Sequence, residues 1–201
     1  MNLRSSTLRF LHSLLLLGLW LAAHPSHAAE TLRGYGLPQA CQVEAWLPSA
    51  DDNEELRESW TFWARSKDGS LLQAKMLHSN QGFEDHKAAF RLELTLASGK
   101  KLACRAALPA DSWRSHFDAI QVQTVLDMGR LRANLGLPGH ELLIDCAEIS
   151  GKLAFENLSP PWQPGDGRLE SGSRDKGLFQ SFPSLRARVR GELNTSAGSM
   201  T

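Results

Sequence analysis

Three aspartates of this 201-residue chain have sequence neighbours that could turn a carboxyl group into a proton donor. Asp118 lies between a phenylalanine and an alanine, Asp145 follows three aliphatic residues, and Asp85 precedes a histidine. A carboxyl group in an apolar cavity stays protonated because desolvation disfavours its charged form, and it can then protonate a double bond. A hydratase or cyclase needs such an acid. An exposed or turn-capping position is the preferred interpretation for each aspartate, so they are weak catalytic candidates.

Metal, nucleophile and phosphate chemistry have no recognisable motif in the sequence. The histidines after residue 28 are never three to five residues apart, and no cysteine pair has metal-ligand spacing; these histidines are His78, His86, His116 and His140. We interpret them as scattered surface or turn residues. The chain also lacks a Gly-x-Ser-x-Gly elbow and a glycine-rich loop between a strand and a helix. We therefore expect no metal and no cofactor.

Three aromatic residues are the candidates for binding an apolar ligand. Trp60 and Phe62 lie on one face of a predicted strand, and Phe90 begins another. Buried aromatic side chains contribute heavily to the core of a small β-domain whatever its function. A barrel of about eight strands has room for side chains or for one small ligand. Core filling and ligand binding therefore both remain open for these residues.

Alternating apolar and polar residues predict the elements that must position these side chains. Phe90–Leu96 places its apolar residues on one face, and after a Ser-Gly turn Leu102–Leu108 repeats the pattern. This period of two is typical of antiparallel strands that are buried on one side. Further strands are expected at Cys41–Trp46, Trp60–Arg65, Leu71–His78, Glu141–Cys146, Lys152–Leu158 and Ser184–Leu193. The expected interior residues are Phe90, Leu92, Leu94, Leu102, Cys104, Ile144 and Phe155.

The pattern is weaker elsewhere in the chain. Ala119–Leu126 and Gly129–Asn134 alternate only in part, and we prefer two strands there over a helix across Ser115–Leu135. The segment 110–117 reads as irregular. The segment 159–175 is rich in Pro, Gly and Ser and is predicted to be a long loop. The small, polar residues 194–201 are predicted to form a flexible tail.

The N-terminal segment has the features of a secretory signal peptide. Arg4 and Arg9 precede Phe10–Ala23, a run of 14 residues dominated by leucine, and Ser26 and Ala28 suit a cleavage site after residue 28. The apolar run is shorter than the roughly 20 residues of a membrane span. We expect a periplasmic or secreted protein without an integral membrane segment after cleavage. Its organisation is then a signal peptide at 1–28, one β-domain at 29–193 and the tail at 194–201.

Charge and cysteine content constrain the class of protein further. Loss of residues 1–28 leaves 20 basic and 22 acidic residues, and a net charge of −2 gives no global reason to bind nucleic acid. Three cysteines in an oxidising compartment predict one disulfide and one buried thiol. The pairing among Cys41, Cys104 and Cys146 stays open. Arg186, Arg188 and Arg190 line one face of the last predicted strand, as a solvent face or as a docking patch for an acidic partner or lipid headgroups.

Two groups of motifs can be compared with a known family. An aromatic-rich strand turns at an Asp-Gly pair, and the next strand ends near a Ser-Asn pair; the segments are Ser59–Trp63, Asp68–Gly69, Gln73 and His78–Phe90. An apolar strand, a Pro-rich loop and a closing strand then follow, at Lys152–Trp162, Gly165–Gly167 and Phe182–Gly191. Over about residues 41–193 the chain resembles the first domain of the lipocalin-like superfamily of carotenoid 1,2-hydratases, AttH-type periplasmic proteins and fungal survival-factor proteins.

The resemblance implies an all-β, antiparallel lipocalin-like β-barrel or sandwich. It also implies a small hydrophobic ligand, a lipid or an isoprenoid. Family members usually continue into a second β-barrel-like domain with a His/Asp-rich motif. The resemblance covers the first domain alone. Binding without catalysis is the leading hypothesis. A hydratase or cyclase acting on an isoprenoid, and a ligand-free structural or accessory domain, are the alternatives.

Overall fold

The computed structural model describes residues 47–48, 54–81, 86–136, 139–163, 168–171, 173–179 and 181–200. The chain divides into two units, residues 1–37 with 164–180 and residues 38–163 with 181–201. Several expectations lie outside the described residues, namely the signal peptide, the strand at Cys41–Trp46, the state of Cys41 and the position of Asp85.

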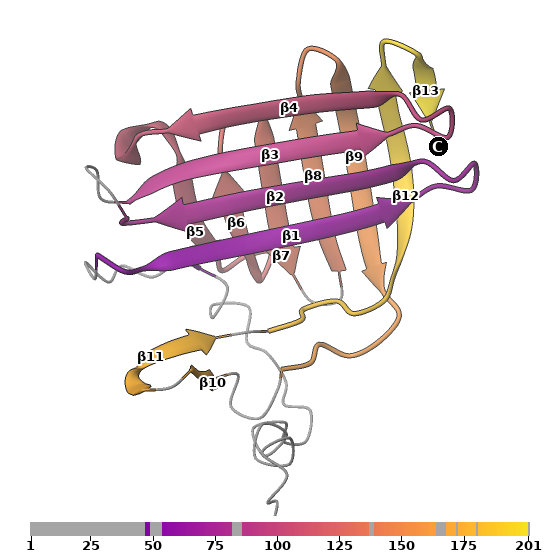
Figure 1. The fold of residues 1–201 in the computed structure, drawn as a ribbon. Coiled ribbons are helices and arrows are strands. Elements are labelled where there is room, and N and C mark those ends of the chain that lie inside the picture. Colours follow the sequence, from indigo (N-terminus) through magenta and orange to yellow (C-terminus); the bar gives the residue numbers. More distant parts are fainter. Residues whose placement is uncertain are drawn as a thin grey trace, which may run out of the picture. The chain divides into compact units, whose positions relative to one another are not determined.

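The first sheet of the larger unit, sheet A, has four antiparallel strands in the order β1-β2-β3-β4 (Figure 1). Its strands are β1 (Arg57–Arg65), β2 (Leu71–Ser79), β3 (Lys87–Thr95) and β4 (Lys101–Leu108). Asp68 shapes the β1–β2 turn, because its Oδ1 accepts a hydrogen bond from the Ser70 backbone N–H at 2.9 Å and Gly69 follows with φ +95°. The alternating pattern predicted all four strands, and the structure confirms them.

The second sheet, sheet B, has seven antiparallel strands in the order β13-β12-β9-β8-β7-β6-β5. They are β5 (Arg114–Asp118), β6 (Gln123–Asp127), β7 (Leu131–Gly136), β8 (Gly139–Asp145), β9 (Ile149–Asn157), β12 (Ala187–Thr195) and β13 (Gly198–Met200). The preference for strands over a helix across Ser115–Leu135 is therefore confirmed. Ile120, which helical spacing would have placed in a core, lies 94% exposed in the β5–β6 turn.

Three segments differ from the sequence-based prediction. The irregular segment at 110–117 contains a short 3-10 helix, Ala110–Ser112, and then β5. The predicted loop at 159–175 includes β10 (Arg168–Ser171) and the start of β11 (Ser173–Phe179), which pair as a hairpin. The predicted tail instead completes β12 and pairs with it as β13. Short hairpins form through backbone pairing and need no apolar alternation. A prediction from amino-acid composition therefore did not identify these strands.

The inner faces of the two sheets enclose one apolar core. In Figure 1 the strands of sheet A run across those of sheet B, which is a form of sandwich packing. The predicted interior residues Phe90, Leu92, Leu94, Leu102, Ile144 and Phe155 are buried, and Cys104 is half-buried against them. The fold is thus an all-β sandwich, and its two sheets do not close into a barrel. Within the described residues, no helix combines the length and apolar character that a membrane span requires.

A disulfide joins the two sheets. Cys104 of β4 is bonded to Cys146, which directly follows β8, with their Cα atoms 6.1 Å apart. The predicted disulfide is therefore confirmed, and the pairing that spacing left open is Cys104–Cys146.

Candidate functional site

The predicted ligand-binding aromatics all lie on the inner face of sheet A. Register places Trp60 opposite Met76 and Met76 opposite Phe90, so these three side chains form one row across β1, β2 and β3. Trp60 is half-buried, whereas Phe90 is buried. Phe62 lies in the next row and packs against Phe155 of sheet B, with 5.8 Å between ring centroids. Phe62 therefore fills the core, and Trp60 is nearer to solvent.

Asp118 and Asp145, the two candidate aspartates among the described residues, occupy turn positions in separate parts of sheet B. Asp118 ends β5, and its Oδ1 accepts hydrogen bonds from the backbone N–H groups of Ile120 at 2.9 Å and Gln121 at 3.1 Å. Asp145 is exposed at the end of β8, and two strands lie between β8 and β5. Asp118 thus caps a turn, as the sequence allowed, and the two carboxylates do not share a site.

An acid–histidine pair, in which the imidazole is buried and the carboxylate is half-buried, lies directly beside the aromatic row. Glu58 and His78 face each other across β1 and β2 in the row next to Trp60 and Met76. The Glu58 Oε2 atom lies 3.1 Å from His78 Nδ1. His78 is fully buried, while the Glu58 side chain is 28% exposed. Because a carboxylate only accepts hydrogen bonds, the proton of the neutral imidazole lies on Nδ1. The Nε2 atom is then a hydrogen-bond acceptor.

Two more aromatic rings enclose the His78 imidazole. The His86 ring centroid lies 5.3 Å from it, and the Trp113 ring centroid lies 5.1 Å from it. The Trp113 indole N–H donates a 2.7 Å hydrogen bond to the His86 carbonyl oxygen, which joins the segment before β5 to the start of β3. We refer to Glu58, His78, His86 and Trp113 as the histidine cluster.

Local backbone geometry holds this cluster in place. His86 adopts a left-handed conformation with φ +55°, and its backbone N–H donates to the Asn80 side-chain oxygen at 2.9 Å. Asn80 is itself buried, and its backbone N–H donates to the Leu56 carbonyl oxygen at 3.1 Å. Positive φ is uncommon for a non-glycine residue, and the hydrogen bond to Asn80 holds His86 in this conformation.

The Nε2 atom of His78 is the unusual atom of the cluster. It is buried and has no hydrogen-bond partner among the residues that the structure describes. A buried polar atom without a partner costs about 1–3 kcal/mol, a cost that an ordered water or a ligand relieves. A histidine oriented by a carboxylate can accept or donate a proton, or hydrogen-bond a ligand, through this nitrogen. In the described part of the chain, no three His, Cys, Asp or Glu side chains are grouped as a metal site would need.

No protein-family model, curated protein or solved structure matches this chain. The histidine cluster was missed by the sequence interpretation, which placed His78 at the surface or in a turn. The signal was present in the alternation, because His78 continues the inner-face series Leu72, Ala74 and Met76. Glu58 likewise continues the inner-face series of Trp60 and Phe62.

His140 is a second buried histidine that was predicted to be exposed. It lies on β8 opposite Phe155, and the Gly136 backbone N–H donates to its Nδ1 at 3.3 Å. Burial lowers the pKa of the imidazole to about 4, against an upward contribution from a hydrogen bond with the Pro183 backbone. His140 is thus neutral at physiological pH. His116, in contrast, is exposed as predicted.

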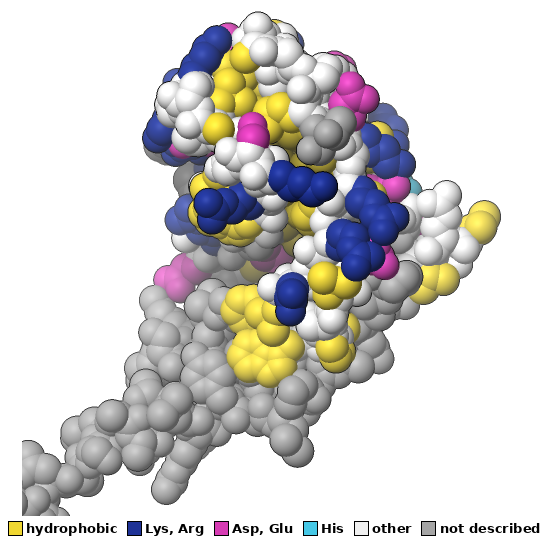
Figure 2. Space-filling model, turned by 90° about the vertical axis from the view of Figure 1, so that its right-hand side faces the viewer, with side chains coloured by type: hydrophobic (Ala, Val, Ile, Leu, Met, Phe, Trp, Pro, Cys, Tyr) yellow, Lys and Arg dark blue, Asp and Glu magenta, His cyan; other side chains and the backbone are white. Residues whose placement is uncertain are grey.

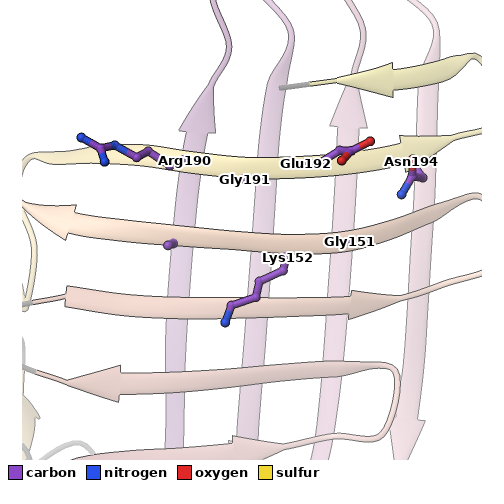
Figure 3. A pocket seen from close by; sticks show the side chains of 7 residues that line it. Gly151, Lys152, Arg190, Gly191, Glu192 and Asn194 are labelled. Carbon is purple, nitrogen blue, oxygen red and sulfur yellow. The ribbon is translucent and has the colours of Figure 1, made fainter.

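A surface hollow on sheet B is explained by strand packing. It has a volume of about 490 Å³ and is lined by β9 and β12, including Gly151 and Gly191. A Cβ atom at Gly151 would lie 2.1 Å from the Glu192 carbonyl oxygen, so the close approach of the strands requires glycine there. Figure 3 shows that the Lys152, Arg190 and Glu192 side chains spread over the sheet without converging. The hollow is not a candidate site.

Proposed function

We propose that this chain is an exported, lipocalin-like protein that binds a small hydrophobic molecule, a lipid or an isoprenoid, against the inner face of sheet A. Ligand sites of this kind combine an apolar lining with few polar groups that fix orientation. Half-buried Trp60 offers the lining at the rim of this face, with Met76 and Phe90 packed behind it in the core. The neighbouring Glu58–His78 pair offers the polar group. Trp60 and Glu58 both reach solvent, so this end of the inner face is the expected entrance.

The observation that carries the proposal is the unpartnered Nε2 atom of the buried His78. An apolar ligand with a hydroxyl group at one end would donate a hydrogen bond to this nitrogen while its hydrocarbon part packs on Trp60, at the solvent-facing end of the aromatic row. Glu58 would hold the imidazole in one orientation and tautomer. A protein with neither a ligand nor an ordered water there would carry an uncompensated cost in its folded state.

The Cys104–Cys146 disulfide supports the location in the periplasm or outside the cell. Disulfides form and persist in oxidising compartments and are rare in the cytosol. The signal-peptide pattern at residues 1–28 points to the same route.

The double variant Glu58→Gln/His78→Leu tests the proposal. It should fold with unchanged or raised stability, because an apolar side chain replaces a buried atom that lacks a partner. It should retain about tenfold less co-purified lipid or isoprenoid than the wild type, since one hydrogen bond to the ligand is lost. Native mass spectrometry of protein from its own host measures the retained ligand, and Trp60→Ala should also weaken retention.

The matched control is His116→Leu, which replaces an exposed histidine of β5 in the same way and should leave retention unchanged. Wild-type protein without any co-purified small molecule would contradict ligand binding and favour a structural or accessory domain. The packing of Phe62 on Phe155 is the observation that fits that alternative.

A hydratase or cyclase is the second candidate function, and the Glu58–His78 pair is the observation that favours it. The acid–base group would then be His78 rather than one of the aspartates. An enzyme would turn over an isoprenoid, and His78→Gln would keep the ligand but lower turnover by about 10²–10⁴-fold. Steady product formation by the wild type would decide for catalysis, and ligand retention without turnover would decide for binding.

A further inference from the structure

The outer face of sheet A carries an uneven distribution of charge. The outward positions of β1–β4 hold seven cations and a single carboxylate, Glu93; the cations are Arg57, Arg65, Lys75, Lys87, Arg91, Lys101 and Arg105. All of these cations except the half-buried Lys87 are exposed. The chain as a whole has equal numbers of basic and acidic residues, so this face is locally basic in a neutral protein.

Three of these cations form a row across neighbouring strands. Register places Lys75 of β2 opposite Arg91 of β3, and Arg91 opposite Arg105 of β4. Side chains opposite each other in an antiparallel sheet are about 5 Å apart, and like charges in such pairs destabilise the sheet. A row of three cations is therefore costly for folding, which suggests that it is kept for binding.

Glu93, the one acidic residue at the outward positions of β1–β4, has a pKa that the neighbouring cations lower. Glu93 Oε2 lies 2.7 Å from an Arg91 guanidinium nitrogen, and Glu93 Oε1 lies 3.5 Å from Lys101 Nζ. The hydrogen bond from Arg91 and the charge of Lys101 lower the pKa of Glu93. Lys75 and Arg105 remain without a carboxylate opposite them on this sheet.

On the outer face of sheet B, the cations are paired with carboxylates. Arg188 and Arg190 lie 3.3 and 3.7 Å from Glu156, and Lys152 pairs with Glu141. The arginine stripe that the sequence offered as a docking patch is thus balanced by acids. Figure 2 shows Lys and Arg side chains projecting on the side of sheet A, at the left, and mixed with Asp and Glu on the side of sheet B.

Two large apolar side chains accompany the cations on sheet A. Trp63 is 57% exposed and Leu71 is 40% exposed. They are diagonal neighbours on adjacent strands, because Trp63 is opposite Gln73 and Leu71 is two residues before Gln73. Arg65 and Lys75 flank the pair at the β1–β2 hairpin.

We propose that the outer face of sheet A is a docking surface for an anionic phospholipid membrane, with the cations bound to the headgroups and Trp63 and Leu71 inserted at the interface. Polybasic surfaces bind anionic bilayers, and tryptophan and leucine beside such cations enter the boundary between headgroups and acyl chains. A single-stranded nucleic acid would also suit cations and a tryptophan. The exposed leucine and the disulfide of an oxidising compartment favour the membrane. This surface lies on the opposite face of sheet A from the proposed ligand site and does not depend on it.

Vesicle binding tests the docking surface, using the full chain as its host processes it. We expect co-sedimentation with vesicles of phosphatidylcholine containing 30% phosphatidylglycerol, loss of binding in high salt, and little binding to phosphatidylcholine alone. The variant Lys75→Gln/Arg105→Gln should bind the anionic vesicles about 30-fold more weakly, because two cations leave the membrane surface. Trp63→Ala should weaken binding while leaving its salt dependence unchanged.

The control variant Arg188→Gln/Arg190→Gln removes the same amount of charge from the balanced outer face of sheet B. It should change vesicle binding by less than about twofold. The two double variants differ only at the four substituted positions, so any contribution of the N-terminal segment is equal in both. Equal losses in the two variants, equal binding to neutral and anionic vesicles, or binding to a single-stranded oligonucleotide without binding to vesicles would each overturn the proposal.

Discussion

The variant Cys104→Ser/Cys146→Ser should lose about 4 kcal/mol of unfolding free energy, the entropy of closing a loop across 42 residues of sequence separation. The disulfide ties β4 of sheet A to the end of β8 in sheet B, and the chain between them forms β5 to β8. Without it, the unfolded ensemble gains freedom while the sandwich keeps its packing. The melting temperature should fall by about 10 °C. Denaturant titration monitored by tryptophan fluorescence measures the free energy.

Cys41→Ser is the control for this prediction, because Cys41 does not take part in the Cys104–Cys146 bond. It should leave the midpoint of unfolding nearly unchanged, and its stability should still fall when a reductant is added. The serine double variant should show no such response to reductant. A Cys41→Ser variant that loses as much stability as the double variant would contradict the pairing.

The fold could be predicted from the sequence where one face of a strand is solvated. In β2 and β3 the buried residues alternate with exposed or half-buried ones, and this alternation is visible in the sequence. In β6 the three consecutive residues Thr124, Val125 and Leu126 are all buried. A strand that is buried on both faces loses the period of two, so its sequence no longer differs clearly from a helix.

The Glu58–His78 pair could have been predicted, whereas the rest of the histidine cluster could not. Both residues were visible in the alternation of their strands, and in the observed register, which is centred on Asp68, they face each other across β1 and β2. Trp113 reaches the cluster from the segment that leads from sheet A to sheet B. The pairing of Cys104 with Cys146 likewise depends on how the two sheets pack. Such contacts follow from tertiary packing, which local patterns do not encode.

Acidification should reveal His140 as a source of pH-dependent stability. Its pKa is about 4 in the folded protein, against an ordinary value of 6.5, so the unfolded chain binds a proton that the folded protein excludes. The stability that the neutral imidazole contributes is complete above pH 6.5 and is lost as the pH falls towards 4. The free energy of unfolding should decrease by roughly 3 kcal/mol over this interval.

The variant His140→Gln should flatten the stability curve between pH 6.5 and pH 4.5, because it has no titrating group at this position. The amide oxygen of glutamine can still accept the hydrogen bond that the Gly136 N–H donates to His140. Both proteins should lose stability at lower pH, since paired carboxylates such as Glu93 and Glu141 have pKa values below the ordinary 4.5 of glutamate. Equilibrium unfolding at a series of pH values separates the two contributions. Parallel curves for wild type and variant between pH 6.5 and pH 4.5 would assign the acid sensitivity to groups other than His140.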